Sequence, residues 1–78
     1  MARSETVNFR RNVASLCAQY GRVQEIADKA GISRVYLSRI IHGKADPSLE
    51  VGLQIADAVG FSLEVLMQKP KDFLQRAS

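Results

Sequence analysis

One short segment, residues 33–43, carries the side chains whose types and spacing indicate a chemistry. At about 100° per residue on a helix, Leu37, Ile40 and Ile41 gather on one side, while arginines, a serine and a valine lie roughly opposite. An arginine guanidinium can donate two parallel hydrogen bonds to O6 and N7 of guanine, and a valine can contact the methyl group of thymine. We therefore expect contacts with base edges from Arg34, Val35, Ser38 and Arg39.

Other residues, some inside this segment and some on its flanks, are expected to bind phosphate groups, a contact that positions a protein on DNA without recognising sequence. Gln24 lies at the start of the preceding helix, and helix N-termini attract anions. His42 and Lys44 follow the exposed side chains, where they would hold the opposite rim of a DNA groove. The expected backbone-contacting residues are Arg22, Gln24, Tyr36, His42 and Lys44.

Ordinary surface roles remain an alternative for several of these residues. In this alternative, the arginines are solvated surface charges, Tyr36 covers the core, and His42 is an exposed side chain without a DNA contact. Near the N-terminus, Arg3, Arg10 and Arg11 either reach the DNA backbone or face solvent.

Helices alone are expected to position these side chains. Apolar residues recur with a period of about 3.6 residues and not of two, which predicts five helices, no strands and a compact all-α domain. Residues 22–47 form two short helices joined by a tight turn, in which Gly31 supplies the left-handed residue that closes the first helix. Ser33 is a good N-cap for the next helix, because its hydroxyl can accept a hydrogen bond from an unpaired backbone N–H, and Gly43 ends that helix.

The last two predicted helices carry similar signals. The fourth begins with Asp46 as N-cap and Pro47 at the first helical position, where a missing N–H costs nothing. Ser62 caps the fifth, and Pro70 limits its extent. The inner side of the fourth helix is expected to consist of Leu49, Leu53, Ala56 and Val59.

The chain of 78 residues is expected to form one domain, residues 1–78, with its core at about residues 6–68. The tail, residues 69–78, either adds a last helical turn or stays mobile. The net charge of +3 is unevenly spread: residues 1–44 hold eight Lys and Arg against three Asp and Glu, a net of +5, whereas residues 45–78 have a net of −2. The basic half contains the two-helix segment, as phosphate binding requires.

Composition argues against several other classes of protein. A single cysteine excludes an internal disulfide, and one His with one Cys makes neither a structural zinc site nor a Cys–His catalytic pair. The sequence has no Gly-rich phosphate loop, no apolar run near the roughly 20 residues of a membrane span, and no signal-peptide core. We therefore expect a cytoplasmic protein that is not an enzyme, with no metal, cofactor, membrane or small-molecule partner.

A known family has a similar run of residues. Over roughly residues 9–68, and above all in QEIADKAGISRVYLSRIIHGKADPSLEVGLQIADAVGFSLEVL, the chain resembles the helix-turn-helix of the Cro and phage-repressor family, also called the XRE family. The coinciding features, in order, are Gln24, Ala27, Gly31, Ser33, Gly43, Lys44, Pro47, Ser48, Leu49, Ala56, Gly60, Ser62 and Leu63. The resemblance implies a lambda-repressor-like fold and a transcriptional regulator that binds double-stranded DNA sequence-specifically, with the third helix in the major groove.

Two positions depart from the family pattern together. Many relatives pair an Arg of the first helix with a Glu at the end of the third in a buried salt bridge, where this chain has Cys17 and Ile41. Replacing both members of a buried ion pair by apolar groups is often neutral or stabilising. We therefore expect Cys17 and Ile41 to touch in the core. Gly52 stands on the expected inner side of the fourth helix, where the family usually has a bulky apolar residue.

Relatives in this family mostly bind operators as dimers. Two recognition helices about 34 Å apart match one turn of DNA and a palindromic site. The second half of the chain has more apolar residues than its core obviously needs, so they either form a homodimer interface around the fifth helix or complete a small core. These residues are Phe61, Val65, Met67, Phe73 and Leu74.

The biological role stays open at this point. A phage or plasmid repressor, a restriction-modification controller, an antitoxin-like autoregulator and the DNA-binding fragment of a longer repressor all fit, as do repression and activation. The rival from another class is a helical protein-interaction module that keeps the fold without binding DNA. Acidic or apolar residues at positions 34, 35, 38 and 39 would indicate such a module, and Arg34 and Arg39 argue against it.

Overall fold

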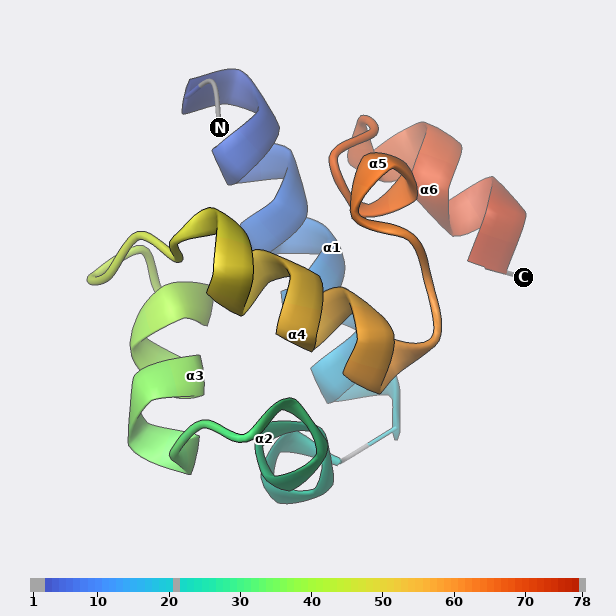
Figure 1. Ribbon diagram of the computed structural model, residues 1–78. Coiled ribbons are helices and arrows are strands. Elements are labelled where there is room, and N and C mark those ends of the chain that lie inside the picture. The colour runs from blue at the N-terminus through green and yellow to red at the C-terminus, as the bar shows by residue number, and fades with distance from the viewer. Residues whose placement is uncertain (1–2, 21, 78) are drawn as a thin grey trace.

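All regular secondary structure in the described part of the chain is helical (Figure 1). The computed structural model describes residues 3–20 and 22–77, with side chains for 4–18 and 22–75. The described residues form six helices and no strand: α1 (Arg3–Tyr20), α2 (Val23–Ala30), α3 (Arg34–Ile41), α4 (Leu49–Val59), α5 (Leu63–Leu66) and α6 (Pro70–Ala77). The predicted all-α fold is confirmed, with one helix more than the five expected.

The long helix α1 holds the two sides of the molecule together. It packs against α2 and α3 and also against α5 and α6, while α4 packs mainly against α2. Figure 1 shows α3 on one side of the molecule, α6 on the other, and α4 crossing between them. The largest fully buried apolar side chains come from every helix except α2: Phe9, Val13, Leu37, Ile40, Ile55, Leu66 and Phe73.

The sixth helix is formed by the tail. Pro70 stands at its first position, where its fixed φ suits a helix and its missing N–H leaves no bond unmade. Phe73 is fully buried and meets the ring of Phe61 edge-on, with ring centroids 5.2 Å apart. Such aromatic pairs add about 0.5–1.5 kcal/mol to the free energy of area burial. The tail is therefore a packed helix, because Phe73 completes the core.

A buried polar side chain ties α1 to the end of α5. Asn12 is fully buried, and its Nδ2 donates to the backbone oxygens of Leu66 at 2.8 Å and Gln68 at 2.9 Å. One turn earlier, Asn8 Nδ2 donates to the oxygen of Met67 at 3.1 Å. These bonds satisfy carbonyls that the short helix leaves unpaired at its C-terminus. The sequence pattern did not indicate this link.

Helix α4 begins later than predicted, and two of its leucines face outwards. Its N-cap is Ser48, with an extended backbone (φ −68°, ψ 166°) and an Oγ that accepts from the backbone N–H of Val51 at 3.2 Å. Asp46 and Pro47 therefore precede the helix, because Ser48 meets the same capping requirement closer to the packed segment. The buried side is Gly52, Ile55 and Ala56. Leu49 and Leu53, which were expected inside, are 61% and 51% exposed, whereas the inner positions of Gly52 and Ala56 are confirmed.

Candidate nucleic-acid interface

The turn before α3 has the geometry that its residues predict. Gly31 adopts a left-handed φ of +74° and closes α2. Ser33 is extended (φ −74°, ψ 153°), and its Oγ accepts from the backbone N–H of Tyr36 at 3.0 Å. The Gly31 turn and the Ser33 cap are thus both confirmed, and together they determine that α3 begins at Arg34.

Helix α3 has one anchored side and one open side. Leu37 and Ile40 are fully buried, so the helix cannot rotate without exposing them. On the open side Val35 is 70% exposed, Arg34 and Arg39 are exposed, and Ser38 is half-buried. An apolar side chain as exposed as Val35 contributes little to the core and is available for contact with a partner.

The four predicted base-contacting residues lie around one shallow hollow of about 310 Å³. Its lining also includes two of the predicted backbone-contacting residues, and the full set is Arg34, Val35, Ser38, Arg39, His42 and Lys44. Two arginines and one lysine make this surface positively charged, and none of the described residues that line it is acidic. A concave cationic surface concentrates polyanions such as DNA near it.

His42 caps the C-terminus of α3 with its ring folded back over the helix. Its Nδ1 lies 2.7 Å from the backbone oxygen of Ser38 and 3.4 Å from that residue's Oγ. Because a carbonyl oxygen only accepts, Nδ1 carries the proton in this hydrogen bond. The neutral ring then presents Nε2 as an acceptor, so a hydrogen bond from His42 to a phosphate requires the doubly protonated ring.

Three other predicted backbone-contacting residues lie outside the hollow. Gln24 is exposed, and its Nε2 donates to Asp28 Oδ1 at 2.8 Å along the side of α2. Arg22 forms an ion pair with Glu25, with Nε 3.3 Å from Oε2. Tyr36 is half-buried and packs against the core. Gln24 would therefore exchange one acceptor for another on binding a phosphate, and the phenol of Tyr36 has less freedom than an exposed side chain.

Arg10 joins this region although sequence reasoning left its place open. Its side chain crosses from α1 to the turn after α3, so that a Cβ added to Gly43 would overlap Nη1 and lie 3.2 Å from Cζ. Gly43 itself has a left-handed φ of +75°. The position of Arg10 adds a cation next to the turn that carries Lys44. No local pattern could indicate this contact, because it joins residues from two distant parts of the chain.

Beneath α3, Cys17 and Ile41 line a common hollow of about 260 Å³. Cys17 is buried, and burial raises the pKa of its thiol above the ordinary value of 9.0, so the group stays neutral at physiological pH. Ile41 is half-buried and packs against the core. Neutral groups thus occupy both positions of the family's ion pair, while their direct contact stays a prediction.

The residues considered for a dimer interface differ in what they can offer a partner. Phe73 has no exposed surface, so it is a core residue and offers no contact to a partner chain. Phe61, Val65 and Met67 are half-buried against the core, and Leu74 is 46% exposed. Of the five, Leu74 offers the clearest exposed apolar side chain.

The described residues show neither a metal-like group of three His, Cys, Asp or Glu side chains nor a helix suited to crossing a membrane.

Comparison with known proteins supports what the geometry indicates. A family model described as helix-turn-helix matches residues 17–66, which include α2, α3 and α4. Searches of curated proteins and of solved structures found no match. Proteins of the matched family are DNA-binding regulators and are not typically enzymes. The chain therefore belongs to the Cro and phage-repressor, or XRE, family of DNA-binding helix-turn-helix regulators.

Proposed function

We propose that this protein is a cytoplasmic transcription regulator that binds a palindromic DNA operator as a homodimer, with α3 in the major groove. The observation that supports it most is the hollow over α3, where four exposed or half-exposed side chains suited to base edges lie beside Lys44. The helix beneath them is fixed by two fully buried residues and a capped N-terminus. A recognition surface of this kind is preorganised, so little freedom is lost on binding.

The first turn of α3 would contact bases. Recognition helices present their N-terminal residues to base edges, which favours Arg34, Val35 and Ser38, followed by Arg39 one turn along. A guanidinium bound to guanine through two hydrogen bonds contributes about 1–3 kcal/mol of discrimination against other base pairs. Val35 would meet a thymine methyl, which explains why a valine is left 70% exposed.

Phosphates would be bound around this centre. Lys44, His42 and Arg10 lie at the C-terminal end of α3, whereas Gln24 and Arg22 lie at the start of α2. Tyr36 would add a hydrogen bond from its hydroxyl. Phosphate contacts from these two groups of residues would position the protein on DNA without reading its sequence.

A dimer would supply the second recognition helix. Eight residues of α3 span about 12 Å, which limits contact to a few base pairs. The longest dimension of the monomer is 28 Å, so two copies side by side fit the spacing of about 34 Å between half-sites. The proposed interface consists of Leu74 together with Phe61, Val65 and Met67. Sedimentation that shows only monomer at high concentration would argue strongly against a preformed dimer.

An electrophoretic shift tests the proposal against the protein-interaction alternative. Genomic DNA fragments should be retarded, with an affinity that falls steeply as salt rises, because phosphate binding releases counterions. Selection of bound sequences should then yield a palindrome. Absence of any shift at low salt would refute DNA binding and favour the interaction module.

A further inference from the structure

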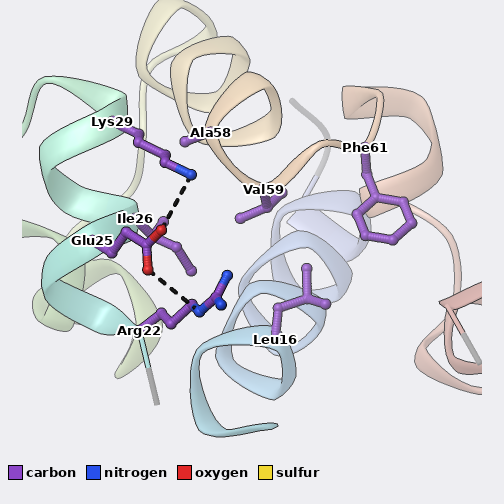
Figure 2. Close-up of a pocket in the computed structure, with 8 residues that line it drawn as sticks. All are labelled: Leu16, Arg22, Glu25, Ile26, Lys29, Ala58, Val59 and Phe61. Atoms are coloured by element: carbon purple, nitrogen blue, oxygen red, sulfur yellow. Dashed lines mark ion pairs between the residues drawn. The ribbon is translucent and has the colours of Figure 1, made fainter. Parts of the chain in front are cut away.

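A second hollow, of about 220 Å³, lies between α1, α2 and the C-terminal end of α4 (Figure 2). None of its lining residues belongs to α3, so it is separate from the recognition surface. The lining is Leu16, Arg22, Glu25, Ile26, Lys29, Ala58, Val59 and Phe61. The proposed function uses two residues of this set, Arg22 for a phosphate contact and Phe61 in the proposed dimer interface.

The walls and the rim of this hollow differ in chemistry. Leu16 and Ile26 are buried, and with Val59 they make an apolar wall that a ring or a branched chain can contact. The volume exceeds that of an engineered apolar cavity of roughly 150 Å³ that binds benzene. An occupant about the size of a substituted benzene therefore fits, with one side open to solvent.

The rim carries an ion-pair triad with one excess positive charge. Glu25 lies between two cations, with Oε2 3.3 Å from Arg22 Nε and Oε1 3.2 Å from Lys29 Nζ. Figure 2 shows the guanidinium end of Arg22, the residue before α2, and the ammonium of Lys29 on α2 both extending over the hollow. Since two cations share one carboxylate, a second carboxylate placed there would be favoured by charge, and a planar guanidinium suits that group.

We propose that this hollow binds a small aromatic carboxylic acid, with the ring against the Leu16 and Ile26 wall and the carboxylate accepting hydrogen bonds from Arg22 and Lys29. Binding holds Arg22 at the hollow and neutralises its charge, which weakens the phosphate contact assigned to this residue. The acid therefore lowers DNA affinity. This regulatory step rests on the proposed DNA-binding function, whereas the binding site does not.

The site is tested first without DNA. Phenylacetate is titrated into the isotope-labelled protein and followed by two-dimensional NMR, with phenylacetamide as the neutral ligand of matched shape. Shifts should centre on Leu16, Ile26 and Val59, and the acid should bind about tenfold more tightly than the amide, because only the acid has charge-assisted hydrogen bonds. Equal affinities, or shifts centred elsewhere, would overturn the site.

Matched lysine variants separate the rim from the net charge. Lys29→Gln should weaken phenylacetate binding several-fold, and Lys29→Arg should retain it. Lys44→Gln removes the same charge at a residue that does not line this hollow, and it should leave the affinity for phenylacetate nearly unchanged. Equal losses for Lys29→Gln and Lys44→Gln would show that the acid responds to overall charge, which contradicts the proposal.

The regulatory step is tested on the selected operator. Saturating phenylacetate should reduce operator affinity about fivefold, at the lower end of typical coupling between two sites. The concentration needed should rise in Lys29→Gln by the factor found in the NMR titration. Unchanged operator affinity despite a filled hollow would overturn the coupling. Failure of the protein to bind any DNA would instead refute the proposed function and leave the NMR result standing.

Discussion

The two ends of α3 are alike in backbone and different in surroundings. Gly31 before the helix and Gly43 after it have nearly the same left-handed φ, +74° and +75°. A Cβ added to Gly31 would meet nothing within 4 Å, whereas one added to Gly43 would meet the guanidinium of Arg10. The N-terminal end of α3, proposed to contact bases, therefore depends on local chain geometry. The C-terminal end, proposed to bind phosphates, also depends on a cation from α1.

The largest effect on stability should come from the buried side of α3, which holds both ends of the helix in place. Leu37→Ala removes a fully buried side chain and should lower the free energy of unfolding by about 2–5 kcal/mol. Val35→Ala, on the 70% exposed side, should change it by less than about 0.5 kcal/mol. Urea denaturation followed by circular dichroism compares the two, and similar losses would contradict the assignment of buried and open sides.

The two glycines test the difference between the ends. Gly31→Ala and Gly43→Ala should each cost about 1–2 kcal/mol of stability, because a side chain at such a φ is strained. Gly43→Ala should lower DNA affinity more, since its Cβ also displaces Arg10 from the turn.

A double variant identifies the cause of that loss. In an Arg10→Ala background, Gly43→Ala should bring no further loss of DNA affinity, measured by fluorescence anisotropy on folded protein. If Gly31→Ala and Gly43→Ala lowered affinity equally in the Arg10-containing protein, Arg10 would have no role at the DNA backbone.

The serine caps give a smaller effect. Ser33→Ala and Ser48→Ala each remove a hydroxyl that accepts a backbone N–H, at the start of α3 and α4, and should each cost about 1 kcal/mol of stability. Only the Ser33 variant loosens the turn that carries Arg34, so only it should weaken DNA binding. Equal effects on DNA binding would mean that the first turn of α3 is not the contact region.

The smallest effect on stability should come from Cys17, which lies beneath α3. Burial raises the pKa of the Cys17 thiol, so the unfolded chain loses this proton near pH 9.0 while the folded chain still holds it. The Cys17 contribution to stability is therefore complete below pH 9.0 and falls as the pH rises above it. Between pH 8 and 10, the free energy of unfolding from denaturation curves should decrease less steeply with pH for Cys17→Ala than for the parent protein. Identical pH dependences would contradict burial of the thiol.

The features predicted correctly from the sequence are those that residues adjacent in the chain determine. The Ser33 cap, the Gly31 turn and the sides of α3 follow from the chemistry of a few adjacent residues, and the structure has them as predicted. The predicted start of α4 was wrong because Asp46 and Ser48 are both good N-caps, and the sequence offers no rule to choose between them. Its leucines were placed inside by size, although the buried side of α4 includes Gly52.

Contacts between distant segments had no such signal. Asn12 binds carbonyls at the end of α5, Arg10 lies over Gly43, and Phe73 enters the core from the tail. Each depends on how helices pack, which periodicity within one helix does not reveal. The candidate base-contacting residues were thus predictable from α3 alone, whereas the surroundings of Lys44 required the structure.

One titration tests most directly the division of α3 into a base-contacting end and a phosphate-binding end. Arg34→Ala and Lys44→Ala are compared by fluorescence anisotropy on the selected operator and on a random duplex, over a range of salt. Arg34→Ala should lose about 1–3 kcal/mol on the operator and little on the random duplex, while Lys44→Ala should weaken both alike and reduce the salt slope by about one. Equal losses from Arg34→Ala on both duplexes, or unchanged binding in both variants, would contradict the account.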